Sequence, residues 1–246
     1  APSHPETGMS LVEATIILMI LTGLTAVMSP AIGDYLEDVR HTKAKEDVEL
    51  IGISIVRLQR DIGSCLKILA TDPCTEANRV DILRSSGADV VAGDLGSSAL
   101  DFANDDIDPN PINWDDDQAV NVGDTMVNQL VGNSPNYNTP AETTPTGYTL
   151  SGPQAGLGWR GVYVTPPIGA DPWGKVYLAN TVFLVVATDS TDGTLEGDRR
   201  GGWSRDAFVI SAGPNGLYDI PFGGNVNFGM TMSGDDLIYV IRGDTR

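Results

Sequence analysis

A single carboxylate, Glu13, interrupts a long apolar run near the start of the chain. From Leu11 to Ile32 it is the only ionisable side chain. About twenty apolar residues, each rising roughly 1.5 Å in a helix, are enough to cross the hydrocarbon core of a bilayer. A charge in such a run is costly to bury unless a cation lies beside it, so Glu13 is a candidate for an assembly or binding role. The alternative is an interfacial acid in an ordinary membrane anchor.

The only two cysteines, Cys65 and Cys74, are separated by eight residues. In an oxidising compartment we expect them to form a disulfide, which contributes about 2 to 3 kcal/mol for a loop of this length by the chain-entropy estimate. The alternative is a pair of free buried thiols. A zinc site is a poor interpretation, because the only histidines are His4 and His41.

The sequence offers little for catalysis. No histidine follows His41, which excludes Ser-His-Asp and Cys-His arrangements from the rest of the chain. There is no phosphate-binding glycine loop with its lysine and no zinc pattern. Paired acids can hydrolyse glycosides, but a chain with 33 acidic residues produces such pairs by chance. We therefore expect a protein that is not an enzyme.

Acidic residues give the chain a formal net charge of −18, which argues against nucleic acid and anionic membrane surfaces as partners. Eleven acids and no Lys, Arg or His lie between Ser85 and Trp159. We interpret residues 89–158 as an acidic, loop-rich insertion whose aspartates suit a solvated surface better than a cation site. A strand or two are expected around 119–122, and a short helix near 126–131.

One long helix is predicted from Met9 to about Ile62. Its first half, residues 9–33, is the apolar segment, which Pro30 and Gly33 should kink or locally unwind. In its second half, residues 34–63, apolar positions recur every three or four residues, so one face is buried. These positions are Val48, Ile51, Ile55, Leu58 and Ile62. The apolar half must pack against lipid or against copies of itself.

Short runs rich in Val, Ile, Tyr and Phe, bounded by Gly, Pro and Asp, predict strands in the last third of the chain, residues 159–246. The predicted strands are 161–165, 176–178, 182–187, 207–211 and 237–241. Short turns between them favour an antiparallel sheet whose apolar face covers the helix. The expected fold class is α+β, with one globular head formed by residues 34–246.

The start of the chain resembles a known processing site. The sequence GMSLVE at residues 8–13 is similar to the site at which type IV pilins and pseudopilins are cut, and Pro30 occupies a position where that family commonly has proline. The resemblance implies a pilin fold, cleavage by a prepilin peptidase between Gly8 and Met9, and methylation of the new amine. In the family, that amine neutralises the residue corresponding to Glu13 in an adjacent subunit. Residues 1–8 are then a leader remnant or an N-terminal extension.

Two later segments resemble the major pseudopilins of type II secretion systems. The first contains Gly158 to Tyr163 and the DPWG turn that starts at Asp171; the second joins 208–216 to 234–238. In those relatives the second segment commonly holds one calcium ion, which requires six to eight oxygen ligands.

Carried over residue by residue, this resemblance implies calcium ligands at Ser211, Asp235 and Asp236. Asn215 stands where an aspartate is frequent. An insertion, residues 217–233, separates the two halves and adds Asp219 as a further candidate. The alternative is a plain hairpin turn whose aspartates cap a strand end.

Together the resemblances imply a structural subunit that polymerises into a type IV pilus-like filament or a type II secretion pseudopilus, with the apolar helices in its core. The implied partners are other copies of the chain, a prepilin peptidase and inner-membrane assembly machinery. The implied location is the inner membrane before assembly, then a periplasmic or extracellular filament. The alternative is a monomeric, membrane-anchored, calcium-dependent adhesin or binding module.

Overall fold

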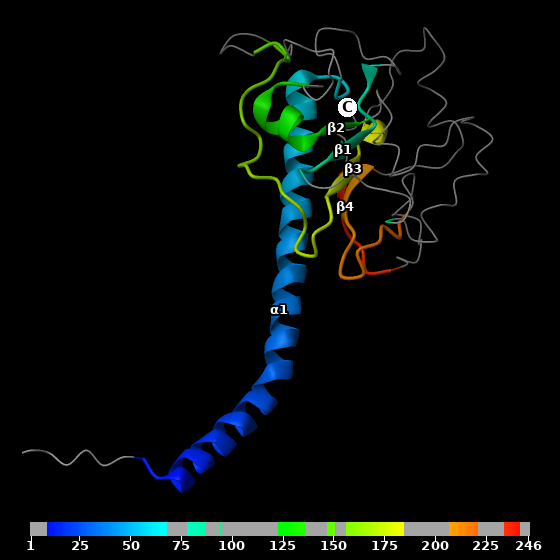
Figure 1. Cartoon of the computed structure of the whole chain (residues 1–246). Helices are drawn as coiled ribbons and strands as arrows, with labels where there is room; N and C mark the ends of the chain where they lie inside the picture. The colour runs from blue at the N-terminus through cyan, green and yellow to red at the C-terminus, as the bar shows by residue number, and fades with distance from the viewer. Residues whose placement is uncertain are drawn as a thin grey trace, which may run out of the picture. The chain divides into compact units, whose positions relative to one another are not determined.

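The computed structural model describes residues 9–67, 78–86, 94, 123–135, 147–150, 156–184, 207–220 and 234–241. The chain divides into two compact units, residues 1–42 and 43–246. One long helix, α1 (Leu11–Ile62), passes through both units. The second unit carries the rest of the described secondary structure (Figure 1).

The ends of α1 follow from local chemistry. Ser10 caps its start, because the serine Oγ accepts a hydrogen bond of 3.2 Å from the backbone N–H of Val12. Gly63 ends it with a left-handed φ of 65° while donating its N–H to the carbonyl of Gln59. The helix continues through Pro30, so of the kink or local unwinding predicted there, the unwinding was wrong and the kink stays a prediction. An isolated proline removes one donor, and the neighbouring turns keep their own hydrogen bonds.

Five strands form one mixed sheet in the second unit, in the order β2-β1-β3-β4-β5. The strands are β1 (Ile82–Arg84), β2 (Gly123–Thr125), β3 (Leu178–Asn180), β4 (Ala207–Ser211) and β5 (Leu237–Ile241). Three neighbouring pairs are antiparallel, but β1 and β2 run parallel. The predicted antiparallel pairing is confirmed for β3, β4 and β5, but the parallel β1–β2 pair makes the sheet mixed, so the prediction was wrong for the sheet as a whole. Turn signals are local, and they carry no information on how β1 pairs with a strand some forty residues later.

The strand predictions met different outcomes. Both β4 and β5 have the predicted bounds. The second predicted strand, 176–178, begins two residues before β3. Residues 181–184 form the 3₁₀ helix η5 (Thr181–Leu184), which corrects the described part of the predicted strand 182–187. The expected short helix is present as the π-helix η4 (Val127–Gly132), and the strand expected around 119–122 lies outside the described residues.

Residues 161–165 do not form the predicted strand, because their backbone groups bond to other elements. The N–H of Tyr163 donates to the carbonyl of Leu130 at 2.9 Å. The carbonyl of Tyr163 accepts a hydrogen bond of 2.9 Å from the Oγ of Ser54 on α1. Gly161 also has a φ of 136°, which does not fit a regular strand.

The middle of the sheet is buried on both faces. On one face Leu83, Ala179 and Val209 pack in a cluster with the apolar seam of α1, as predicted. On the other face Phe208 and Ile210 pack in a second cluster. Because successive residues of a strand point to opposite faces, β4 supplies both clusters and is buried throughout.

Candidate functional site

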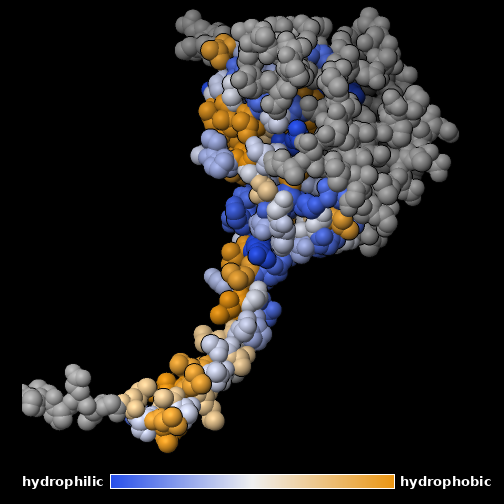
Figure 2. All heavy atoms as spheres, viewed as in Figure 1, coloured by the Kyte–Doolittle hydropathy of each residue, from blue (hydrophilic) through white to orange (hydrophobic). Residues whose placement is uncertain are grey.

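The first half of α1 presents apolar side chains to its surroundings. Leu11 and Met19 are 80% and 77% exposed, and Figure 2 shows hydrophobic residues along this part of the helix. None of its most apolar 18-residue window is buried, and the helix is long and apolar enough to cross a membrane. The hydroxyls of Thr22 and Thr25 donate to the carbonyls of Leu18 and Leu21, so these polar groups are satisfied within the helix.

The residues of the predicted processing and assembly site lie at the start of α1. Met9 is exposed and precedes the helix, while Gly8 lies outside the described residues. Glu13 is exposed in the first turn, where the partial positive charge of the helix N-terminus favours a carboxylate. It has no ion pair within the described part of the chain. Pro30 is exposed inside the helix.

A group of carboxylates lies beside the turn that follows β4. One oxygen of Asp236 accepts hydrogen bonds from the backbone N–H groups of Asp219 and Ile220, at 2.7 and 2.8 Å. The backbone N–H of Asn215 donates to Asp235 at 2.8 Å, and its side-chain amide donates to Asp219 at 2.9 Å. Four of the five residues predicted to bind calcium are therefore neighbours.

Two oxygens of this group, Asp235 Oδ1 and Asp236 Oδ1, are buried without a hydrogen-bond partner. Burial raises the pKa of Asp236 to about 7, and the negative charges of Asp219 and Asp235 add to the rise. A buried carboxylate oxygen without a partner is costly, and a hard cation such as calcium binds this kind of donor. The chemistry of the group therefore fits calcium.

The side chains of this group are not arranged as a complete metal-binding site. Among the described residues, no set of three or more acidic, histidine or cysteine side chains is placed to hold a metal ion. Binding here would also need main-chain oxygens or rotated side chains. Gly213 and Gly234, with φ of 66° and 100°, permit the close packing, because a β-carbon at either position would clash with Asp235 or Asp219 respectively.

The side chain of Ser211 bonds to Asp171 and not to this group of carboxylates, and its predicted role as a calcium ligand stays a prediction. It is fully buried, and its hydroxyl donates to Asp171 Oδ2 at 2.7 Å. The other oxygen of Asp171 accepts from the backbone N–H groups of Trp173 and Lys175. Asp171 thus anchors the DPWG turn to β4. The sequence analysis did not predict this role, although aspartate is common as the first residue of a turn because its side chain accepts hydrogen bonds from the backbone that follows.

Cys65 is buried and disulfide-bonded. The chain has one other cysteine, Cys74, which lies outside the described residues. The bond therefore closes the short loop that follows α1.

Comparison of the chain with protein-family models, with curated proteins and with solved structures gave no match. The functional argument therefore depends on the exposed apolar helix and on the groups described above.

Proposed function

We propose that this protein is a structural subunit that polymerises through the apolar half of α1, in the manner of type IV pilins and pseudopilins. The single observation that carries the proposal is the helix surface around Leu11 and Met19, none of which is buried within the chain. Covering each large apolar side chain contributes about 1.5 to 3 kcal/mol. Lipid covers this surface before assembly, and sister helices cover it in the filament core.

Glu13 and Met9 have complementary roles in this proposal. A prepilin peptidase cuts after Gly8 and releases an amine at Met9, which becomes methylated. That amine then neutralises the Glu13 carboxylate of the adjacent subunit inside the apolar core. The exposed position of Glu13, with no ion pair among the described residues, supports this role because the carboxylate is available to a neighbour.

The head, residues 34–246, covers the outside of the filament. The group of carboxylates beside the turn that follows β4 binds calcium, with Asn215, Asp219, Asp235 and Asp236 as the candidate ligands. The two unpartnered buried oxygens of this group support that assignment. Repetition of one heterologous contact builds an open filament, so a single chain is sufficient.

The proposed location is the inner membrane before assembly and a periplasmic or cell-surface filament afterwards. The partners are other copies of the chain, the peptidase and the inner-membrane assembly machinery. The DPWG turn and the same group of carboxylates favour a secretion pseudopilus, whereas the long acidic insertion favours an extracellular pilus.

Electron microscopy of the cleaved, purified chain after detergent removal tests the proposal. We expect filaments, with N-terminal sequencing showing that they begin at Met9. A chain that stays monodisperse in plain buffer, without lipid, detergent or polymer, would overturn it. Monomers that enter lipid vesicles and never polymerise would instead support a membrane-anchored adhesin or binding module.

A further inference from the structure

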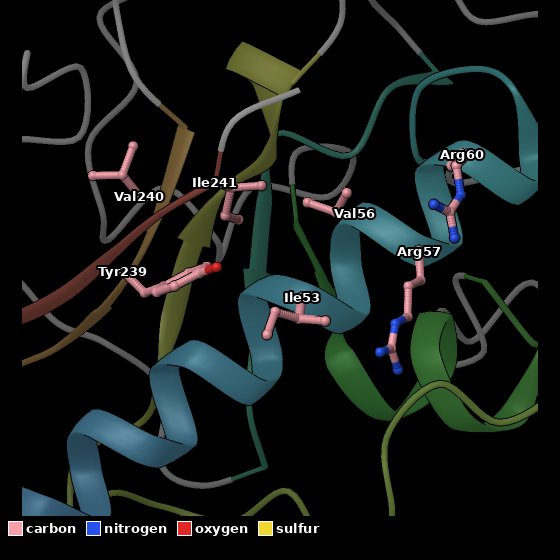
Figure 3. Close-up of a pocket in the computed structure, with 7 residues that line it drawn as sticks. All are labelled: Ile53, Val56, Arg57, Arg60, Tyr239, Val240 and Ile241. Atoms are coloured by element: carbon pink, nitrogen blue, oxygen red, sulfur yellow. The ribbon is translucent and has the colours of Figure 1, made fainter. Parts of the chain in front are cut away.

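A groove of about 610 Å³ lies between the second half of α1 and the strand β5. Its apolar lining includes Ile53, Val56, Tyr239 and Ile241. Arg57 and Arg60 line it from the helix, as Figure 3 shows. The groove is separate from the carboxylates at the other end of β5 and from the apolar half of α1.

One wall of the groove is β5, which lies at the edge of the sheet that the described strands form. β5 is the last strand in the sheet order, so no described strand pairs with its outer side. Tyr239 and Ile241 point toward α1 and belong to the core cluster on that face. Ile53 and Val56 are only partly buried, so an apolar side chain from outside would cover surface that the chain itself leaves open.

Arg57 and Arg60 are the unusual part of this groove. Both are exposed and one helical turn apart, and neither has a hydrogen bond or ion pair to any described residue. Some other cations in the described part of the chain have acidic partners, such as Lys43 with Asp47 and Lys175 with Asp94. Two unpaired guanidinium groups beside an apolar floor are complementary to an acidic segment that also carries apolar side chains.

We infer that the groove binds the acidic segment 101–117 of a second copy of this chain. That segment carries seven aspartates and no cation. Its apolar side chains are Phe102, Ile107, Ile112 and Trp114. The inference rests on the proposed function, which brings sister copies together at high local concentration. The contact is heterologous, so it joins one subunit to the next without closing a ring.

Charge complementarity explains why this segment is selected in a chain with a net charge of −18. Most contacts between copies bring like charges together, which is unfavourable. A contact that places aspartates against Arg57 and Arg60 is favoured over those alternatives and sets the register of neighbouring heads. The apolar floor then contributes by covering Ile53 and Val56.

Photo-cross-linking of the full-length chain tests this contact. The photoreactive residue p-benzoylphenylalanine replaces Val56, and copies with normal and heavy nitrogen isotopes are mixed before assembly. We expect mass spectrometry to find links from position 56 to residues 101–117 that join one normal and one heavy copy. Links within a single copy, links only to other segments, or no links would each overturn the inference.

Matched charge variants test the role of the arginines. The double variant Arg57→Gln with Arg60→Gln should lower the yield of this cross-link by about tenfold or more. The control, Arg40→Gln with Lys45→Gln, removes two exposed charges from the same helix and should leave the yield unchanged. Equal losses in both variants would show a general charge effect and overturn the inference.

Microscopy of the same samples separates this inference from the proposed function. Filaments without the cross-link would overturn the groove contact and leave polymerisation intact. The cross-link without filaments would support the groove contact and overturn polymerisation. Melting temperatures of the charge variants should match that of the chain that carries only the photoreactive residue, because the substituted Arg and Lys side chains are exposed.

Discussion

The ring of Tyr239 lies directly over Gly52, where the edge strand β5 crosses α1. A β-carbon at Gly52 would come within 2.8 Å of Tyr239 Cε1 and 3.5 Å of Ile241 Cγ1. The missing side chain therefore lets strand and helix approach closely. Because Asp235 and Asp236 immediately precede β5, this contact helps to position both the carboxylate group and one wall of the groove.

Substitution of Gly52 should separate the strand from the helix. Alanine normally favours a helix over glycine by about 1 kcal/mol, but at this position the added methyl collides with the Tyr239 ring. We expect Gly52→Ala to lower the free energy of unfolding by about 1 to 3 kcal/mol, measured by chemical denaturation. The control is Gly169→Ala, because a β-carbon at Gly169 meets open space. A stabilised Gly52→Ala variant would contradict the contact.

Substitution of Glu13 should prevent assembly without affecting the head. Glu13→Gln keeps the size of the side chain and removes the charge that pairs with the Met9 amine. Loss of one partner from a buried ion pair costs about 3 to 5 kcal/mol, so filaments should be absent or form far more slowly by light scattering. Glu49→Gln, an exposed change on the same helix, serves as control. Filament growth at the parent rate would disprove the role of Glu13.

Removal of calcium should destabilise the head. A ligand at 100 times its dissociation constant stabilises the native state by about 2.7 kcal/mol, so a chelator should lower the melting temperature. Asp236→Asn keeps an oxygen that can accept the hydrogen bonds from Asp219 and Ile220 but loses the charge, and it should no longer respond to calcium. Asp34→Asn, on an exposed acid, should respond as the parent does. An identical melting temperature with calcium and with chelator would remove the calcium assignment.

Loss of the disulfide should destabilise the loop after α1. Replacing both Cys65 and Cys74 by serine should lower the free energy of unfolding by about 2 to 3 kcal/mol in the chain-entropy estimate. Reduction of the parent chain should produce a similar loss, measured by denaturation with and without reductant. A parent chain insensitive to reductant would contradict the expected contribution.

The hydroxyl of Tyr148 should stabilise the folded chain through its hydrogen bonds near η4. Its hydroxyl accepts a hydrogen bond of 2.8 Å from the backbone N–H of Lys67 and donates one of 2.7 Å to the buried side chain of Gln129. Tyr148→Phe removes the partner of the Lys67 N–H and of Gln129 Oε1, so we expect a loss of about 1 to 3 kcal/mol in unfolding experiments. Tyr35→Phe, an exposed control, should change little. Equal stability of the two variants would argue against the network.

Helices and strands whose hydrophobic pattern extends over many residues were predicted well from the sequence. The period of three or four apolar residues predicted the buried face of α1, and local capping signals agree with its ends at Leu11 and Ile62. β4 and β5 were predicted because five consecutive residues carry each pattern. β1 and β2 have three residues each, which is too short for a period-two pattern to stand out.

The cluster of carboxylates beside the turn after β4 was also predicted only in part. Resemblance and residue type placed Asn215, Asp219, Asp235 and Asp236 among the candidates, and the fold brings all four together. They did not show that Ser211 faces Asp171, because that hydrogen bond spans forty residues. The sequence likewise presented Arg57 and Arg60 as an ordinary charged helix face, and only the position of β5 beside them forms a groove.

The sequence by itself determined the long helix, its uncovered apolar half and the lone acid within it, because helix period, caps and hydrophobicity are local properties. The tertiary structure decided the sheet order, the parallel pairing of β1 with β2, the hydrogen bond from Ser211 to Asp171 and the groove beside β5. Those features depend on contacts between segments far apart in the chain, and such contacts are selected by the packing of the whole head.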